Sequence, residues 1–398
     1  MRRISPVRIA GMGCISAAGS NVAANIAALD KGERNAVAPS FLDVETACPV
    51  FRAEVPESAP EGLPDPFLYE RCARTARMAA CAATEALEDA GYDFRHLAGL
   101  RVGICLGTSV GTALNFSSFY LGQKAGRNEP LDPVDRYLAS NPAPALARML
   151  RTTGPVQTVA NACASGADAI GYGAEWIRSG LCDIVLCGGA DGLSRITYLG
   201  FGSLKLLSHT LCRPFDKHRA GLNLGEGAAV MVLEAAPRGR GRAPLGTVLG
   251  YGTATDAWHL TAPHPEARGL VLALGHATAQ AGIRNEDIAF INAHGTATPT
   301  NDASESKFFR NIFPTTPFLG TKGVTGHTLG AAGALEAVFT VKHLERGRLP
   351  ASVGFAEVDP ELGIAPVTSP VDVAGSIAMS QSLAFGGNNS VLLFGKEA

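Results

Sequence analysis

Hydrophobic and polar positions form two kinds of pattern along this chain. Short apolar runs that end in glycine-rich turns, at 101–108 (RVGICLGT), 183–191 (DIVLCGGAD) and 288–296 (IAFINAHGT), predict buried strands. Longer stretches at 74–91 and 267–282 have the apolar spacing of helices, and each ends at a glycine. Strand–helix alternation of this kind predicts an α/β protein in which mainly parallel sheets are buried between helices.

The two halves of the chain share this pattern in the same order. A helix, an Ala-Gly stop, a linker and a strand ending in Gly-Thr occupy 85–108 and recur at 276–296. A later helix extends from a glycine to a stop glycine over the same distance at 166–180 and at 333–347. Two matches in the same order favour an internal duplication over chance similarity.

Each half also ends in a predicted β-hairpin, GEGAAVMVLE in the first and SLAFGGNNSVLLFG in the second. The polar, basic and Pro/Gly-rich stretch 237–244 (PRGRGRAP) is the predicted seam between the halves. We therefore expect a first half at 1–245 and a second half at 246–398.

Charge, cysteine usage and hydropathy narrow the function classes. A net charge of −2 over 398 residues provides no basic excess for general nucleic-acid binding. The nine cysteines contain no C-x-x-C pair, so neither a disulfide framework nor a zinc site is indicated, and we expect a reducing, cytoplasmic setting. Pro6 and Arg8 interrupt the start of the chain, which favours a first strand over a signal peptide. No apolar run reaches the roughly 18 residues of a membrane span.

One cysteine lies in an unusual setting. Cys163 stands in the stretch 159–173 (VANACASGADAIGYG), among small residues and at the predicted start of a helix. Unpaired N–H groups and the positive end of the helix dipole would stabilise a thiolate there and lower the pKa of the thiol. A thiolate is the attacking species in nucleophilic catalysis. The alternative interpretation is a small hydrophobic core residue.

Two histidines in the second half strengthen the nucleophile hypothesis. His294 follows a predicted strand in NAHGTATPTND, and His327 lies on the glycine-rich approach to a helix in KGVTGHTLGAAG. Both are predicted at the carboxyl edge of the sheet layer that carries Cys163, where α/β proteins place their sites.

Several separated motifs then match one family in the right order. They are NACASG, RPFDKHRAGLNLGEGAAVMVLE, DAWHLTAPHPEARG, NAHGTATPTND, KGVTGHTLGAAG and AFGGNNS. Over almost its whole length the chain resembles the elongating, Cys-His-His type of β-ketoacyl-acyl carrier protein synthase, in the thiolase superfamily. The resemblance implies the thiolase fold, in which two similar βαβαβαββ halves form a five-layered α-β-α-β-α architecture.

The resemblance also implies a decarboxylative Claisen condensation. Cys163 would take an acyl group from an acyl carrier protein as a thioester. His294 and His327 would donate hydrogen bonds to the malonyl thioester oxygen during decarboxylation. The backbone N–H groups of Cys163 and Phe385 would form the oxyanion hole, with Gly386 and Gly387 allowing close backbone approach and the phenyl ring gating the acyl pocket.

Further positions are carried over from the family. A buried polar network behind the histidines would comprise Lys322, Asp302, Glu305 and Glu336, with an orienting or electrostatic role. Thr296 and Thr298 would bind the phosphopantetheine arm of the carrier. Val110 would lie at the deep end of the acyl pocket, contributed across a dimer. Phe116, Phe119 and Tyr120 would line that pocket, or alternatively belong to the core or the dimer interface. Two basic groups are candidates for gripping an acidic carrier: Arg71, Arg74 and Arg77 on a helix, and Arg213 and Lys217 in a loop.

Three departures from the usual family pattern leave these groups in place. Asn161 replaces a threonine, Gly323-Val324 replace Ser-Met, and Asn223 replaces an apolar residue. They suggest a specialised pathway.

The implied product belongs to fatty acid, polyketide or polyene-like lipid synthesis. The implied partners are an acyl carrier protein and a second subunit in a homodimer, with a heterodimer possible; no metal, redox cofactor, nucleic acid or membrane is expected.

Competing functions fit less well. A thiolase would need a second cysteine near the C-terminus, but the last one is Cys212. An initiating synthase pairs its cysteine with one histidine and an asparagine, whereas His327 argues for two histidines. The alternative from another class is a non-catalytic partner subunit resembling a chain-length factor, and such partners lose the nucleophile that Cys163 supplies.

Overall fold

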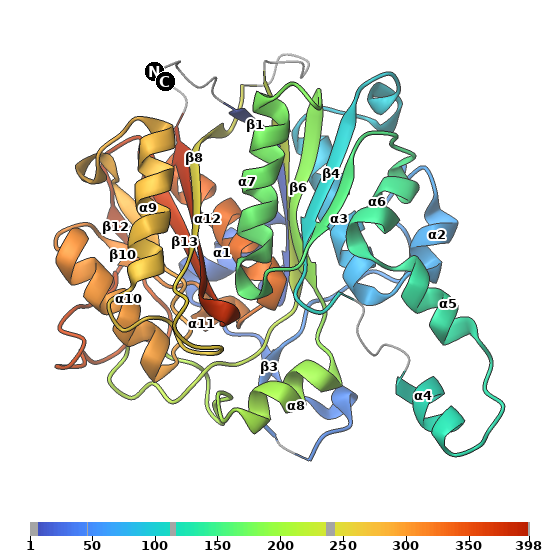
Figure 1. Ribbon diagram of the computed structural model, residues 1–398, viewed down its shortest axis with the longest axis horizontal. Helices are drawn as coiled ribbons and strands as arrows, with labels where there is room; N and C mark the ends of the chain where they lie inside the picture. The colour runs from blue at the N-terminus through green and yellow to red at the C-terminus, as the bar shows by residue number, and fades with distance from the viewer. Residues whose placement is uncertain (1–6, 46, 112–116, 236–242, 397–398) are drawn as a thin grey trace.

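The computed structural model describes residues 7–45, 47–111, 117–235 and 243–396 (Figure 1). Its main feature is a ten-stranded sheet in the order β10-β9-β13-β14-β8-β1-β7-β6-β4-β5. Five of its strands belong to the first half of the chain: β1 (Val7–Ser16), β4 (Val102–Gly107), β5 (Val156–Val159), β6 (Ile184–Asp191) and β7 (Gly227–Glu234). The second set is β8 (Gly246–Thr255), β9 (Phe290–Asn292), β10 (Phe318–Leu319), β13 (Ile377–Ala384) and β14 (Asn388–Gly395).

The two sets have the same topology. In the first, β4 lies parallel to β5 and β6, and β7 lies antiparallel to β6 and β1. In the second, β9 lies parallel to β10 and β13, and β14 lies antiparallel to β13 and β8. Strands β1 and β8 join the sets through a short antiparallel pairing at Val7–Ile9. The predicted duplication is therefore present in the strand order.

Helices connect the strands and complete the layers. The α-helices of the first half are α1 (Val22–Lys31), α2 (Pro66–Arg71), α3 (Arg74–Asp89), α4 (Ser117–Lys124), α5 (Asp132–Ala139), α6 (Pro142–Leu150), α7 (Ser165–Arg178) and α8 (Arg195–Ser203). Those of the second half are α9 (Arg268–Ala281), α10 (Pro299–Ile312), α11 (Lys322–Thr325) and α12 (Ala332–Arg346). With α1, α2, α4, α5, α8, α11 and the short strands β2, β3, β11 and β12 set aside, each half reads βαβαβαββ, as predicted for the thiolase fold.

The layers follow from which faces of the helices are apolar. Helices α7 and α12 pack against each other between the two strand sets, while α3 and α9 cover the outer faces (Figure 1). Helix α3 buries a stripe of alanines with Met78 and Leu87, which allows the helix to approach β1 closely. Added Cβ atoms at Gly11 and Gly13 of β1 would lie 2.2 and 2.1 Å from α3 carbonyl oxygens. The order helix–sheet–helices–sheet–helix is the predicted five-layered architecture.

Two of the four predicted stop glycines are the helix caps themselves: Gly282 (φ 67°) caps α9, and Gly347 (φ 63°) caps α12. Helices α3 and α7 are capped by Ala90 and Ser179, and the predicted Gly91 (φ 74°) and Gly180 (φ 71°) follow one residue later. Two short sheets, β2–β3 (Ala36–Val37 and Val50–Phe51) and β11–β12 (Arg348–Leu349 and Val371–Asp372), lie outside the main sheet. Among the described residues, no helix has both the length and the apolar character that crossing a membrane requires.

One predicted element is wrong. The second hairpin exists, since β13 and β14 pair from Ile377↔Gly395 to Ala384↔Asn388. GEGAAVMVLE, however, forms the single strand β7, whose antiparallel partner β6 ends at Asp191 and is separated from it by the segment that contains α8. Most of the predicted seam at 237–244 lies outside the described residues.

Candidate active site

Cys163 lies on a sharp turn between a strand and a helix. The chain leaves β5, passes through a short 3-10 helix, η3 (Ala162–Ala164), and enters α7. Ala162 has φ 46°, a left-handed conformation that costs an L-residue about 1 kcal/mol or more and persists only where surroundings hold it. The Ser165 hydroxyl holds the turn by accepting from the Asn161 N–H (2.8 Å) and donating to the Ala162 carbonyl (2.6 Å).

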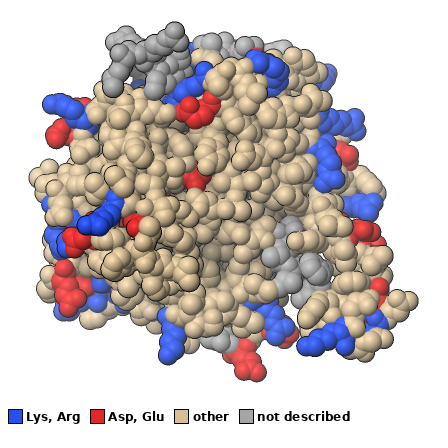
Figure 2. Space-filling view, in the orientation of Figure 1, with Lys and Arg blue, Asp and Glu red and all other residues tan. Residues whose placement is uncertain are grey.

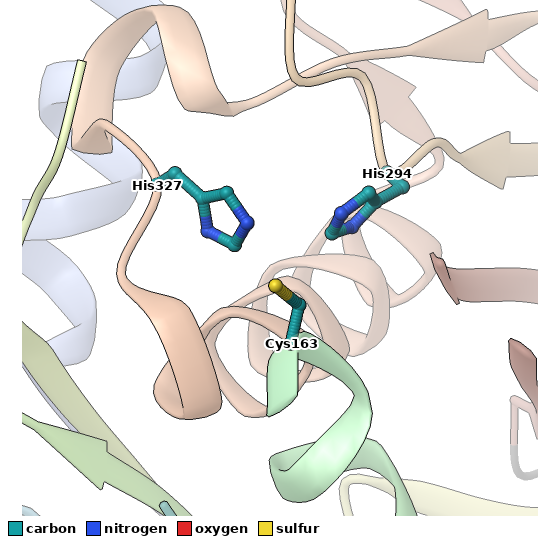
Figure 3. A group of neighbouring side chains, drawn as sticks. All are labelled: Cys163, His294 and His327. Carbon is teal, nitrogen blue, oxygen red and sulfur yellow. The ribbon is translucent and has the colours of Figure 1, made fainter. Parts of the chain in front are cut away.

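The two predicted histidines converge on this cysteine from the second half. His294 follows β9, and His327 lies between α11 and a second 3-10 helix, η5 (Leu329–Ala331). One ligand-type atom from each of the three side chains lies within 4.8 Å of the others, and the two imidazole rings are 5.2 Å apart (Figure 3). All three side chains are buried.

Hydrogen bonds assign the same tautomer to both histidines. The Lys322 ammonium contacts Nδ1 of His294 (3.2 Å), the carbonyl oxygen of His294 (2.5 Å) and the carboxylate of Glu336. An ammonium only donates, so Nδ1 of His294 accepts and its proton resides on Nε2. Nδ1 of His327 accepts the Leu329 N–H (3.1 Å), which leaves Nε2–H as the donor there too.

The electrostatics keep both rings neutral. Burial and the positive charge of Lys322 lower the pKa of His294 and of His327 well below the ordinary value. Two neutral imidazoles with Nε2–H groups are suited to donate hydrogen bonds to a developing oxyanion without first losing a proton.

The expected low pKa of the Cys163 thiol is wrong for the substrate-free protein. Burial raises the pKa of Cys163 to about 12, although the charge of Lys322 and the Phe385 N–H oppose the rise. Nearby carboxylates of Asp191 and Glu336 add to it. Burial destabilises the thiolate more than the start of helix α7 can stabilise it, because Cys163 is almost completely buried.

The predicted polar network is assembled behind the histidines. Glu305 on α10 accepts the backbone N–H groups of His294 and Gly295, both at 2.7 Å. Asp302, one turn earlier, accepts the N–H groups of Phe215 (2.7 Å) and Ala297 (3.2 Å). These two carboxylates therefore fix the loop that carries His294, while Lys322 and Glu336 fix its ring.

A pocket leads to the three side chains. Its walls include Cys163, both histidines, Thr296, Thr298, Phe201, Leu222 and Phe385. The hydroxyls of Thr296 and Thr298 are 2.9 Å apart and are buried in the wall. The Phe385 N–H lies near enough to the Cys163 sulfur to lower the pKa of the thiol, and the Phe385 ring stacks on Phe201 with centroids 5.4 Å apart.

Gly386 and Gly387 form the tight turn between β13 and β14. Their φ angles, 84° and 76°, lie in the region that favours glycine. The Gly386 N–H donates to the Leu260 carbonyl (2.8 Å), and the Gly387 carbonyl accepts the Asp256 N–H (2.7 Å). This turn places the Phe385 N–H beside Cys163.

Other expectations are met less well. Val110 packs against the apolar cluster that contains Leu222 and is not among the residues that line the pocket of the single chain, so its expected contribution across a dimer stays a prediction. Phe116 lies outside the described residues. Arg74 forms an ion pair with the buried Glu226 (2.7 Å), and Arg77 donates to carbonyls of its own segment, including that of Cys72 (3.0 Å). The guanidinium groups of these two arginines therefore have internal partners, which weakens the prediction that they grip a carrier.

The remaining basic candidates also have neighbours. Arg71 lies over the Phe67 ring at 5.4 Å. Arg213 is 4.0 Å from the Asp216 carboxylate, and Lys217 pairs with Glu357 at 2.5 Å.

Two of the departures from the family pattern have structural reasons. A side chain at Gly323 would place its Cβ 2.0 Å from the Val353 carbonyl oxygen. The Asn223 side chain accepts the Cys212 N–H (2.7 Å) and donates to the Ser208 carbonyl (3.0 Å), while its own carbonyl accepts the His327 N–H (2.8 Å). Asn223 thus holds the segment beside His327.

The sequence did not mark several residues beside the site, and three of them matter for its geometry. Asp191 and Asp168 are buried carboxylates that hold loops around Cys163, and Phe201 lines the pocket. No local signal marked them, because a lone Asp or Phe is ordinary in sequence and acquires its meaning from partners far along the chain.

Comparisons with known proteins agree with this geometry. Residues 5–238 match the N-terminal domain model of β-ketoacyl synthases, and residues 245–356 match the C-terminal domain model. The chain is 31% identical to 3-oxoacyl-[acyl-carrier-protein] synthase 2 of Staphylococcus aureus over 408 residues, 98% of each chain. Among solved structures it superposes on a chain of the ishigamide ketosynthase/chain length factor with a TM-score of 0.90 and 32% identity, covering 99% of this chain and 100% of that chain.

A second solved structure contains a ketosynthase from Xenorhabdus doucetiae in complex with its chain length factor. The TM-score is 0.84 at 32% identity, covering 100% of this chain and 99% of that chain. The protein belongs to the β-ketoacyl synthase family. It is accordingly an enzyme of the acyltransferase class.

Proposed function

We propose that the protein is a 3-oxoacyl-[acyl-carrier-protein] synthase that condenses malonyl-carrier protein with an acyl group held on Cys163. The observation that carries this proposal is the pair of neutral histidines, each with Nδ1 occupied and Nε2–H available beside the Cys163 sulfur. A non-catalytic partner subunit has no use for this arrangement.

The first half-reaction is acyl transfer. The Cys163 sulfur bonds to the thioester carbonyl carbon, the carbonyl oxygen becomes an oxyanion, and the N–H groups of Cys163 and Phe385 stabilise it. Collapse breaks the bond to the carrier's sulfur. Because burial keeps the resting thiol protonated, its proton ends on the departing thiolate, and no external base is consumed.

The second half-reaction is decarboxylation and condensation. The malonyl C–C bond breaks, carbon dioxide leaves, and negative charge develops on the thioester oxygen, where His294 and His327 donate from Nε2. The resulting carbanion attacks the acyl carbonyl on Cys163. Collapse of that intermediate releases the 3-oxoacyl product, and the Cys163 thiolate regains a proton from water.

Intact-protein mass spectrometry with acyl carrier protein thioesters from C2 to C16 tests the first step. A mass gain that disappears in Cys163→Ala is expected, and the chain length with the largest gain identifies the preferred acyl group. His294→Ala and His327→Ala should retain acylation while losing malonyl decarboxylation by roughly 100-fold or more, the usual loss when one oxyanion donor is removed. Equal loss of both half-reactions in the histidine variants would contradict the assigned roles.

The substrates arrive on the phosphopantetheine arm of the carrier, with Thr296 and Thr298 binding the arm and Val110 limiting the acyl chain across the dimer. The chain itself holds no redox cofactor in this proposal. A thiol with two imidazoles is also a ligand set that zinc favours. Activity that survives exhaustive chelation supports the metal-free mechanism, and loss that zinc restores would overturn it.

We assign the enzyme to the cytoplasm and divide it into a nucleophile half, 1–245, and a histidine half, 246–398. All nine cysteines are free thiols in the structure, which suits a reducing compartment.

The working assembly in this proposal is a homodimer. Helix α5 buries none of its residues; Leu138 within it is 69% exposed, and Leu131 at its N-cap is 62% exposed. The middle of the face shown in Figure 2 also carries few charged side chains, as subunit interfaces do. Native mass spectrometry of the purified protein is expected to show twice the chain mass. A monomer that acylates only after a related subunit is added would indicate a heterodimer.

A further inference from the structure

A buried carboxylate outside the pocket links the two sides of the proposed oxyanion hole. Asp168 lies in the first turn of α7 and is 1% exposed. Its carboxylate accepts three side-chain hydrogen bonds, from the Asn161 amide (2.5 Å), the Tyr251 hydroxyl (2.9 Å) and the Ser390 hydroxyl. The three donors come from three different parts of the chain.

Two of these donors lead to the predicted oxyanion groups. Asn161 immediately precedes Ala162, the residue with φ 46° that turns the chain into Cys163. Ser390 lies in β14, the strand that follows the Phe385–Gly387 turn. Tyr251 is different, because it lies in the middle of β8, whereas Asn161 caps η3 directly and Ser390 follows the Phe385–Gly387 turn within a few residues on β14.

Resting on the proposed function, we infer that Asp168 is a positioning residue that sets the geometry of the oxyanion hole. By binding Asn161 on one side and Ser390 on the other, it fixes the Cys163 N–H of the first half relative to the Phe385 N–H of the second half. It touches neither substrate nor the reacting atoms, since it is absent from the described pocket lining.

The physical reason for a carboxylate at this place is its acceptor capacity. An ionised carboxylate has about four lone-pair sites and can accept all three donors at once, which an amide or hydroxyl cannot. Asn161 is also the residue that departs from the family threonine; its amide reaches Asp168 from the residue just before the left-handed Ala162, where backbone strain needs support.

The test separates oxyanion stabilisation from general support of the helix. Variants Asn161→Ala and Ser390→Ala each remove one hydrogen bond to the Asp168 carboxylate. Tyr251→Phe is the matched control, because it removes the third hydrogen bond to the same carboxylate. For each protein we would measure the rate of Cys163 acylation by an acyl carrier protein thioester and the rate of alkylation by iodoacetamide. Alkylation displaces iodide at a saturated carbon and develops no oxyanion, so it reports thiol access and reactivity alone.

Acylation is expected to fall about 10-fold or more in Asn161→Ala and Ser390→Ala, in line with the loss of aimed oxyanion donors, while alkylation stays within about twofold. Tyr251→Phe should change both rates by less than about twofold. Equal loss of acylation in all three variants, a parallel fall in alkylation, or unchanged acylation in the first two would overturn the inference.

A double variant that exchanges the amide and the carboxylate distinguishes loss of positioning from poor folding. In Asn161→Asp combined with Asp168→Asn, the new amide donates to the new carboxylate and its oxygen still accepts from Ser390. The double variant should recover a higher ratio of acylation to alkylation than Asp168→Asn alone, and failure to exceed it would count against the inference. If the wild-type protein is alkylated but never acylated, the proposed function itself fails, which is a separate outcome.

Discussion

The two halves of the molecule contain the same turn with opposite uses. In the first half, Ala162 (φ 46°) precedes Cys163 at the start of α7; in the second, Leu329 (φ 55°) precedes Gly330 at the start of α12. The first turn presents a sulfur to the pocket, whereas the second presents only backbone. Its Leu329 N–H instead donates to Nδ1 of His327 and so sets the tautomer of a histidine.

The backbone N–H groups at the second turn already donate to a carboxylate of the protein, that of Asp191. Asp191, at the end of β6, accepts the N–H groups of Gly330 and Ser109, both at 2.7 Å, and the Thr108 hydroxyl at 2.6 Å. The corresponding strand end in the other half, at β13, places the Phe385 N–H beside Cys163. In the proposed function, the first turn keeps its backbone N–H groups available for substrate, whereas the carboxylate of Asp191 already accepts from the second turn. The same backbone turn can therefore serve as part of an active site only where its N–H groups are not already bonded within the protein.

The largest effect is expected when the first turn is made to resemble the second. Cys163→Gly removes the sulfur while leaving the backbone, so acylation should fall by at least roughly 1,000-fold, as for loss of a nucleophile in other covalent enzymes. Intact-protein mass spectrometry with an acyl carrier protein thioester measures this. An acyl adduct of undiminished yield would show that another residue is the nucleophile.

Adding a side chain to the second turn should destabilise the folded state. A Cβ at Gly330 would lie 2.5 Å from the Ser109 nitrogen and 2.7 Å from an Asp191 carboxylate oxygen. Gly330→Ala is therefore expected to lower the free energy of unfolding by about 3 kcal/mol, measured by urea denaturation. Gly275→Ala is the matched control: nothing lies within 4 Å of its added Cβ on α9, so its stability should rise by about 0.5–1 kcal/mol. A Gly330→Ala protein as stable as wild type would show that the second turn can move.

Asp191 connects this comparison to pH. Burial raises the pKa of Asp191 from 3.8 to about 6, so between these values the folded state binds more protons than the unfolded state. Stability contributed by this group is therefore present at low pH and is lost as pH rises through 6. Relative to wild type, Asp191→Asn should gain about 3 kcal/mol of unfolding free energy between pH 3.5 and pH 7.

Urea denaturation of both proteins at the two pH values measures this difference, with Asp135→Asn on the exposed face of α5 as the control. A difference between wild type and Asp191→Asn that does not change with pH would contradict the raised pKa.

The smallest effect is expected at the strained residue of the first turn. Ala162→Gly relieves the left-handed strain of about 1 kcal/mol but increases the conformational freedom of the unfolded chain by a similar amount. The unfolding free energy should change by less than about 1 kcal/mol in thermal or urea unfolding. A loss of several kcal/mol would mean that the Ala162 methyl group has a packing role.

Much of the fold was predictable because it depends on local signals. The apolar spacing at 74–91, the stop glycines Gly282 and Gly347, and the FGG turn before β14 all act within one element. The single strand β7 was misread as a hairpin because its partner β6 lies beyond α8, and no short-range pattern encodes that distance.

The site was predictable in its residues but not in its electrostatics. Cys163, His294 and His327 were found from motifs, and the structure brings them together. The raised pKa of Cys163 depends on complete burial, which spacing alone does not report. The role inferred for Asp168 depends on Ser390, which is more than half the chain away, and Arg74 looked like a surface charge until its partner Glu226 was seen.

The crossed contacts of the two turns have a consequence for descent. The end of β6 covers the turn of the second half through Asp191, and the end of β13 covers the turn of the first half through Phe385. If the two halves descend from one ancestral half, that half needed a second copy of itself to complete either turn. Fusion of two copies would then leave one turn free to bind Asp191 and to hold His327.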